Sequence, residues 1–423
     1  MSIELGIAIH DITPPPGLPM GGYAARTAPA SSIRDPLACR VAVFRCGDSL
    51  TALIALDLLY VRNPWAADVR GAVARSLGID PAAVMLAATH THAGPAVFRS
   101  AMRETEELAP YERRLAATIE EAVAAARGAL RPVRLSFGTA HVDGVAANRQ
   151  EEKLELDDSV RVLTARTVAG DIAGVIASFG CHPTVLPAAN LAYSRDLFGA
   201  AIDAAESAIG APAILFNGAA ADVSTRFTRN AQTPEEVVRL GHRLATGIVE
   251  AIGDSHTISD AAISACMIDV PLAPRPLPTA EDARREMSVA ADRVEAARGR
   301  VAAAELRRLM AQLEGAMAQL YLTQNGGADA VLGSLPQHAP VQVIHLGGCD
   351  VLGVPGEMFS AVGRAVCAAR SRPALLMGYA NDYVGYLVPS GALTGYESMM
   401  SFVTAESADA IAAAITEASE ARR

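Results

Sequence analysis

The chain has 423 residues, of which 51% are hydrophobic and 19% are charged, a balance typical of a large globular protein. Its formal net charge of −10 argues against a nucleic-acid partner, because such partners bind basic surfaces. No apolar run approaches the roughly 20 residues of a membrane helix, no secretory signal is visible, and the six cysteines lack paired spacing. We therefore expect a cytoplasmic protein with reduced thiols and no stable membrane anchor.

Strand and helix patterns alternate through the first half of the chain. Short apolar runs bounded by polar residues predict strands at 3–9, 38–44, 51–58, 83–88, 134–142, 160–167, 175–179 and 213–216. Helical spacing of apolar residues predicts helices at 65–77, 110–129 and 197–209. The sequence Thr233-Pro-Glu-Glu indicates a helix start, because Thr can cap the N-terminus and Pro suits the first turn, and this helix should run to about residue 251.

The second half returns to strands after a helical segment. Residues 279–324 hold almost no turn residues apart from Gly299 and Gly315, which predicts a helical hairpin or one long interrupted helix. Further strands are expected at 259–270, 341–346, 350–354 and 374–378, and a closing helix at 405–418. This order predicts an α/β protein with mixed β-sheets flanked by helices and a helical insertion near 279–324. Without repeats or linkers, we expect one domain over residues 1–423.

The segment Thr89-His-Thr-His-Ala-Gly-Pro directly follows the apolar run 84–88. Side chains at positions i and i+2 of a strand share one face, so His90 and His92 can converge on one point at the rim of a sheet. Two neutral imidazoles are typical ligands of a divalent metal, most often zinc. The alternative is a pair of strand-end histidines that bond to the backbone, and the pair alone does not decide between the two.

Three later segments hold residues that could complete a metal site. His182 follows an apolar strand and precedes a proline, which repeats the setting of the first pair. Glu357 follows a strand and a Pro-Gly turn, where it could be a ligand or the N-cap of the next helix. Residues 378–386 contain three tyrosines, and such clusters often serve only to pack a loop.

Taken together, these segments resemble the neutral/alkaline non-lysosomal ceramidase family, zinc-dependent amidases that cleave the N-acyl bond of sphingoid lipids. The similarity covers most of the chain and keeps the family's order, which argues against a chance match. Its motifs, with the Thr89–Pro95 segment among them, include Gly6-Ile-Ala-Ile-His-Asp-Ile-Thr, Met20-Gly-Gly-Tyr-Ala, Asn148-Arg, His182-Pro-Thr, Ser194-Arg-Asp, residues 216–225, Pro355-Gly-Glu and residues 378–396.

The resemblance implies a set of metal ligands and a catalytic histidine. The implied zinc ligands are His90, His182, Glu357 and Tyr386. Two imidazoles, a carboxylate and a phenol oxygen suit zinc and leave an open position for water. Tyr is an uncommon ligand, and Tyr383 and Tyr379 are the nearest alternatives to Tyr386. His92 is then free of the metal and faces the reacting carbonyl, as a hydrogen-bond donor or a proton shuttle.

Two further residues take catalytic roles by the same resemblance. Arg149 is similar to an active-site arginine of the family, and its fixed positive charge could stabilise an oxyanion or hold an acidic substrate group. The alternative for Arg149 is a surface salt bridge. Tyr396 matches a family tyrosine that reaches toward the substrate amide, where it could help to protonate the leaving nitrogen.

Ser224 lies in a stretch that departs from the family pattern. The family reads close to Gly-Asp-Val-Ser-Pro, whereas this chain reads Ala221-Asp-Val-Ser-Thr. A serine nucleophile needs an adjacent base and usually a sharp Gly-x-Ser-x-Gly turn, which is missing from the sequence. We therefore expect Ser224 to position substrate or water. Asp222 and Asn217 are either supporting groups of the site or ordinary Asx turns.

These observations predict a zinc-dependent amidohydrolase of a small N-acyl substrate. Secreted relatives carry an additional C-terminal immunoglobulin-like domain, and this sequence ends about one helix after Tyr396, so we expect a relative with the catalytic domain only. Its substrate would then be a soluble N-acyl compound or lactam rather than ceramide. The alternatives are an esterase or lactonase on the same centre, a serine hydrolase that uses Ser224, and a non-catalytic zinc-binding relative. A homo-oligomer is compatible with the sequence.

Overall fold

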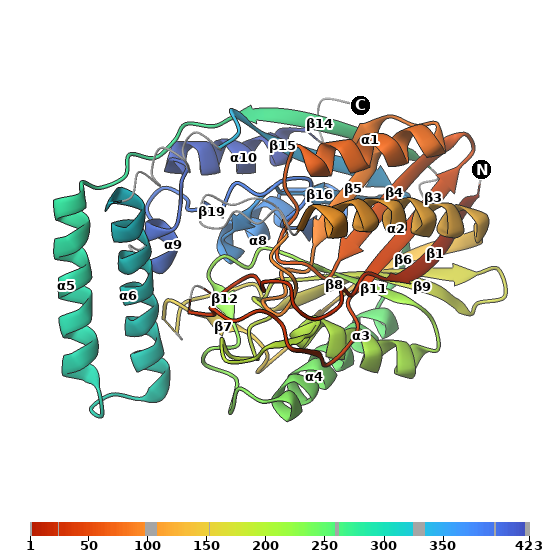
Figure 1. Ribbon diagram of the computed structural model, residues 1–423. Coiled ribbons are helices and arrows are strands. Elements are labelled where there is room, and N and C mark those ends of the chain that lie inside the picture. Colours follow the sequence, from red (N-terminus) through yellow and green to blue (C-terminus); the bar gives the residue numbers. More distant parts are fainter. Residues whose placement is uncertain are drawn as a thin grey trace.

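The computed structural model describes residues 2–23, 25–97, 108–151, 153–258, 262–324, 335–392 and 395–418. Two β-sheets pack face to face, and helices cover their outer faces (Figure 1). Their shared core is formed by one face of each sheet, for example Phe44 and Leu163 from the larger sheet and Val351 from the smaller. The mixed α/β architecture with flanking helices confirms the predicted fold class.

The larger sheet contains nine strands. They are β1 (Ile3–Asp11), β3 (Ala38–Cys46), β4 (Ser49–Leu56), β5 (Val84–Ala88), β6 (Arg131–His141), β8 (Ser159–Thr167), β9 (Ile172–Phe179), β11 (Ala213–Asn217) and β13 (His256–Ile258). Their order is β11-β9-β8-β6-β1-β3-β4-β5, with β13 paired to β6. Strands β5 and β11 stand at opposite ends of this order, but the sheet curls so that the ends of these two strands meet. There, Nδ2 of Asn217, the last residue of β11, donates to the carbonyl of Thr89, which directly follows β5, at 3.1 Å.

The smaller sheet has the order β14-β15-β16-β18 and lies against the inner face of the larger one. Its strands are β14 (Ile263–Pro271), β15 (His338–Leu346), β16 (Cys349–Gly353) and β18 (Ala374–Met377). Three two-residue pairs complete the strands: β2 (Ser32–Ile33) with β10 (Ala192–Tyr193), β7 (Ala147–Asn148) with β12 (Val223–Ser224), and β17 (Glu357–Met358) with β19 (Tyr386–Leu387).

The helices divide between the two outer faces and one projecting hairpin. They are α1 (Trp65–Leu77), α2 (Ala109–Gly128), α3 (Asp196–Ile209), α4 (Pro234–Gly253), α5 (Ala280–Ala297), α6 (Ala303–Gln324), α8 (Ser360–Ala368), α9 (Tyr396–Met399) and α10 (Ala405–Glu417), with a short 3-10 turn, η1 (Pro81–Ala83). Helices α1 to α4 cover the larger sheet, and α8 and α10 cover the smaller. In the described part of the chain, none of these helices has the length and apolar character needed to cross a membrane.

Side-chain caps explain where several helices begin. Oγ1 of Thr233 accepts a hydrogen bond from the backbone N–H of Glu236, as the sequence predicted for the start of α4. Oγ1 of Thr279 caps α5 in the same way, through the N–H of Asp282. Helices α5 and α6 pack against each other at one side of the molecule, and α6 also contacts α9 (Figure 1). Residues 279–324 therefore form a helical hairpin.

The long predicted elements are present, with bounds that differ by a few residues. The helix expected at 65–77 coincides with α1, and the strand expected at 259–270 is β14, although residues 259–261 lie outside the described residues. The N-cap interpretation of Glu357 is wrong, because this residue lies in β17 and Phe359 is the residue that precedes α8.

Candidate metal centre and active site

The first histidine pair converges through a turn rather than a strand. Strand β5 ends at Ala88, and His90 has a φ of +66°, which lies outside extended geometry. Strand periodicity is therefore not what brings His90 and His92 together, and this part of the prediction is wrong. The two rings nevertheless meet, with 3.3 Å between their Nε2 atoms. Oγ1 of Thr89 donates to Oδ1 of Asp57 at 3.1 Å and holds the start of this turn.

The His90 ring is fixed by one hydrogen bond and one aromatic contact. Its Nδ1 lies 2.6 Å from the carbonyl oxygen of Leu59, and because a carbonyl only accepts, Nδ1 carries the proton. The ring stacks on Tyr379 with 4.0 Å between centroids. Burial lowers the pKa of His90 to about 3, so the ring is neutral and its Nε2 carries the lone pair.

His182 has the same arrangement on the other histidine segment. It follows β9, and its Nδ1 donates to the carbonyl oxygens of Ala220, at 2.7 Å, and Val223, at 3.1 Å. Burial, followed by the charge of Arg149, lowers the pKa of His182 well below its usual value. The Nε2 lone pair then points into the site, where it has no hydrogen-bond partner among the described residues.

Glu357 faces both histidines. Its Oε2 lies 3.0 Å from Nε2 of His182, and its Oε1 lies 3.9 Å from Nε2 of His90. The hydroxyl of Tyr383 donates to Oε1 at 2.5 Å, and that of Tyr379 contacts Oε2 at 3.5 Å. Two of the three clustered tyrosines thus hold the carboxylate, which is more than the loop packing that the sequence alone suggested.

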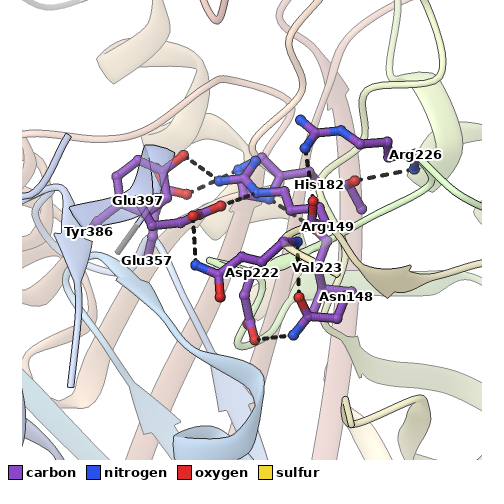
Figure 2. Close-up of polar contacts among 12 residues, drawn as sticks. Asn148, Arg149, His182, Asp222, Val223, Arg226, Glu357, Tyr386 and Glu397 are labelled. Atoms are coloured by element: carbon purple, nitrogen blue, oxygen red, sulfur yellow. Dashed lines mark hydrogen bonds and ion pairs between the residues drawn. The ribbon is translucent and has the colours of Figure 1, made fainter. Parts of the chain in front are cut away.

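Tyr386 lies beside Glu357 because the two residues are paired between β17 and β19. The close approach of these strands requires glycine at position 356, where a Cβ would lie 2.7 Å from the carbonyl oxygen of Gly385. The Tyr386 hydroxyl accepts a hydrogen bond from Nη2 of Arg149 at 2.8 Å (Figure 2). The phenol oxygen is therefore oriented by a charged donor.

Arg149 is buried, with 6% of its surface exposed, which rules out the surface salt bridge considered from the sequence. Its Nε donates to Oε1 of Glu397 at 2.8 Å, and Figure 2 shows its guanidinium directed at both Glu397 and Tyr386. The guanidinium also lies 5.6 Å from the ring centroid of Tyr396. Among the described residues, Glu397 alone forms an ion pair with Arg149. The sequence analysis gave Glu397 no role, although Glu397 directly follows Tyr396.

His92 completes a group of three imidazoles. One ring nitrogen from each of His90, His92 and His182 lies within 4.8 Å of the others. The ring of His92 packs on the backbone of Gly22, where φ is +94° and a Cβ would lie 2.4 Å from the ring, and it meets Tyr23 edge-on. Its Nδ1 is buried without a hydrogen-bond partner among the described residues, in contrast to Nδ1 of the other two rings.

Ser224 and Asp222 lie close together in the sequence but form different hydrogen bonds. Oγ of Ser224 accepts from the N–H of Arg226 at 3.2 Å, and no hydrogen bond in the described part of the chain joins it to an imidazole. Asp222 accepts from Nδ2 of Asn148 and from the N–H of Ser360. These bonds reach distant segments, so Asp222 supports the site rather than a local Asx turn.

Asn217 links the two histidine segments. Its Nδ2 donates to the carbonyls of Thr89 and Cys181, both at 3.1 Å, and its Oδ1 accepts from the N–H of Cys181 at 3.2 Å. Each of these partners directly precedes a histidine of the site. Asp196, which sequence reasoning left without a role, accepts the N–H groups of Val185 and Leu186 and so holds the loop after His182.

The chemistry of this donor set fits a divalent cation. Two neutral rings direct Nε2 lone pairs toward a carboxylate, and these atoms repel one another unless a proton or a cation lies between them. The low pKa values of His90 and His182 disfavour the proton. Donation from Nδ1 to a backbone carbonyl is the arrangement that orients metal-binding histidines in proteins. His90, His182 and Glu357 therefore lie around one point with His92 beside them, and Tyr386 is the strand partner of Glu357.

Comparisons with known proteins agree with this architecture. Residues 3–221, more than half of the chain, match the profile of the family described as neutral/alkaline non-lysosomal ceramidase, N-terminal. The solved neutral ceramidase from Pseudomonas aeruginosa superposes with a TM-score of 0.77 at 20% identity, over 99% of this chain and 74% of that one. A structure described as ceramidase complexed with C2 gives the same values. No curated protein sequence matches the chain.

Proposed function

The chain belongs to the neutral/alkaline non-lysosomal ceramidase family of hydrolases, and from that membership we propose that it is a zinc-dependent amidohydrolase. Its substrate would be a small molecule with an N-acyl bond. One observation carries the proposal: His90 and His182 are neutral rings whose Nδ1 atoms donate to carbonyls and whose Nε2 atoms are directed at Glu357.

The proposed ligands are His90, His182, Glu357 and Tyr386. When bound there, zinc supplies Lewis acidity, which polarises a carbonyl and makes water a nucleophile near neutral pH. Tyr383 and Tyr379 hold the Glu357 carboxylate in place through their hydroxyls. Arg149 orients the Tyr386 phenol by donating to its oxygen. Burial raises the pKa of Tyr386, and the charge of Arg149 opposes that rise.

His92 is proposed as the hydrogen-bond donor to the reacting carbonyl. Because its Nδ1 has no partner, the tautomer with the proton on Nε2 places the donor toward the shared centre. Burial, followed by the proximity of His90 and His182, lowers the pKa of His92 and keeps its ring neutral. An N–H aimed at the carbonyl oxygen stabilises the negative charge that develops there when water adds.

Tyr396 is proposed to give its proton to the leaving nitrogen as the C–N bond breaks. Burial raises the pKa of Tyr396 to about 12, so the phenol is protonated at neutral pH. The acyl carbon gains the oxygen of water, the amine leaves with the proton of the phenol, and a proton released by the attacking water restores the phenol. Ser224 lies next to His182 across a backbone bridge and is proposed to position substrate or water.

Chelation and reconstitution test this proposal. The purified protein is treated with dipicolinate, dialysed and supplied with Zn²⁺, Mn²⁺ or Mg²⁺, and turnover is followed on N-acyl amines, N-acyl amino acids, lactams and esters. We expect chelation to abolish turnover and zinc to restore it. Turnover that survives complete removal of metal would contradict the proposal. Faster cleavage of esters than of every amide would support the esterase or lactonase alternative.

A further inference from the structure

Three arginine side chains lie together at the wall of the candidate site. Nη1 of Arg226 donates to the backbone carbonyl of Arg149 at 2.9 Å, as Figure 2 shows. Nη1 of Arg229 donates at 2.7 Å to the carbonyl of Thr184, in the loop after the second histidine segment. Nη2 of Arg307, from helix α6, donates to the carbonyl of Arg226 at 2.8 Å. We call these three residues the arginine cluster: Arg226, Arg229 and Arg307.

No carboxylate neutralises the arginine cluster at close range. Among the described residues, none of its three guanidinium groups has an Asp or Glu oxygen within 4.0 Å, whereas the neighbouring Arg149 and Arg308 both form ion pairs. The Nε atoms of Arg229 and Arg307 are buried and find no hydrogen-bond partner in the described segments. Buried donors of this kind are costly unless a ligand satisfies them.

The three charges also act against one another. Burial, followed by the charge of Arg149, lowers the pKa of Arg226 to about 10. Burial lowers the pKa of Arg229 and of Arg307, and the charge of Arg307 adds to the effect on Arg229. An anion placed among these groups would relieve both the repulsion and the missing hydrogen bonds.

The nearest acidic side chains are engaged elsewhere or open to solvent. Glu397 pairs with Arg149. Asp196 accepts three backbone N–H groups. Glu314, on α6, is an exposed residue, but burial of its carboxyl raises its pKa, and it acts on Arg226 without an ion pair within 4.0 Å among the described residues. The charge of the arginine cluster is therefore available to a ligand.

A cavity opens beside Arg226 of this cluster. It has a volume of about 520 Å³ and is lined by Arg226, the one member of the cluster that reaches it, by Tyr396, by the ion-paired Arg149 and Glu397, and by the first turns of α6. Tyr396 is the proposed proton donor to the leaving nitrogen, so this cavity lies on the amine side of the bond that breaks. A ligand anion held by Arg226 would therefore belong to the amine half of the substrate.

We infer that the arginine cluster binds an anionic group on the amine half of the substrate, so that the preferred substrates are acidic N-acyl amines such as N-acyl amino acids. This inference rests on the proposed function, because it assigns the substrate class of the same site. Guanidinium groups bind carboxylates and sulfonates through paired N–H···O bonds, and either group satisfies the chemistry described here.

Three substrates that share one acyl chain test the inference. They are N-dodecanoylglycine, with a carboxylate, N-dodecanoyltaurine, with a sulfonate, and neutral N-dodecanoylethanolamine. We expect kcat/KM for at least one acidic substrate to exceed that for the neutral one by about 10- to 100-fold, the range that charge-assisted hydrogen bonds give. The better of the two acids identifies the anionic group. Equal or faster cleavage of the neutral amide overturns the inference but leaves the proposed amidase intact.

Two variants test whether the preference for acidic substrates comes from the arginine cluster. Arg307→Gln and Arg229→Gln should each reduce kcat/KM for the acidic substrate about tenfold more than for the neutral amide. Arg285→Gln, on the exposed face of α5, is the matched control, because Arg285 forms an ion pair with Asp282 and lies outside the site. It should leave both values unchanged. Loss of the same factor for acidic and neutral substrates would assign these arginines a structural role and overturn the inference.

A binding measurement without turnover tests this inference independently of the amidase proposal. Calorimetry with N-dodecanoylglycine and N-dodecanoylethanolamine is performed on metal-free protein, which cannot turn them over by the proposed route. We expect the acid to bind at least about fivefold more tightly, and Arg307→Gln to abolish the difference. Equal affinity for the two compounds overturns the inference whether or not the protein proves to be an amidase.

Discussion

Nε2 of His182 lies 3.0 Å from Oε2 of Glu357, while Nδ1 of the same ring donates to a backbone carbonyl. Both facing atoms are acceptors, so their approach requires a proton or a cation between them, and burial disfavours the proton on His182. We predict that Glu357→Gln lowers the affinity for zinc at least about 100-fold, measured by competition with a chelating dye. The amide can donate to His182, so the fold should survive. Glu295→Gln, on the exposed surface of α5, is the control, and unchanged zinc affinity in Glu357→Gln would exclude this centre.

His90 and His92 should separate metal binding from catalysis. Nδ1 of His90 donates to Leu59, whereas Nδ1 of His92 has no partner, so only the first ring is oriented as metal-binding histidines are. His90→Ala should lose zinc. His92→Ala should keep zinc, measured by elemental analysis, and lose about 10²- to 10⁴-fold in kcat. Loss of zinc from both variants would instead make the three imidazoles the ligand set.

Ser224 should be dispensable for bond cleavage. Its Oγ accepts from the N–H of Arg226, and no imidazole in the described part of the chain accepts its proton. Ser224→Ala should therefore keep kcat within about tenfold of the unmodified protein, whereas loss of a true nucleophile lowers kcat by several orders of magnitude. Rapid labelling of Ser224 by a fluorophosphonate, with turnover indifferent to chelators, would establish the serine hydrolase alternative.

Tyr383 should act on the metal through Glu357. Its hydroxyl donates to Oε1 at 2.5 Å, and its ring is held by stacking on Tyr60 with 4.6 Å between centroids. Tyr383→Phe removes the hydrogen bond and keeps the ring, so we expect zinc affinity to fall about 10- to 100-fold. Tyr321→Phe, at an exposed position on α6, should bind zinc as the unmodified protein does. An unchanged affinity in Tyr383→Phe would show that the carboxylate needs no such support.

The sequence predicts the long elements and most of the site, because both leave local signals. Helix α1 and strand β5 follow from apolar periodicity, and His90, His182 and Glu357 each stand just after a strand or a turn. The positive φ of His90 has no such signal, and so the turn that joins the rings was mistaken for a strand.

The support of the site could not be predicted, because it comes from contacts between distant segments. Strands β17 and β19 have two residues each, too few for periodicity, yet their pairing sets Glu357 beside Tyr386. Asn217 bonds to Thr89, 128 residues away. Glu397 carried no motif of its own, and its role as the partner of Arg149 depends on how α9 packs.

The pair of Arg149 and Glu397 should make stability depend on pH. Glu397 is 2% exposed, and its oxygens accept from Nε of Arg149 and Nε2 of Gln150, both at 2.8 Å. Burial raises the pKa of Glu397, but the charge of Arg149 and the hydrogen bond from Gln150 outweigh it, so the pKa lies below the ordinary value of 4.5.

A carboxyl group with a lowered pKa in the folded state binds its proton more weakly there than in the unfolded chain. Its stabilisation is therefore complete above about pH 4.5, the unfolded value, and is lost as the pH falls toward the folded value. We predict that urea midpoints of the unmodified protein decline over this acidic range. In Glu397→Gln this part of the decline should disappear, and stability at pH 7 should fall by about 3–5 kcal/mol because Arg149 remains buried without its partner. Glu295→Gln should follow the unmodified protein throughout, and an identical acid profile in Glu397→Gln would show that Glu397 does not titrate on unfolding.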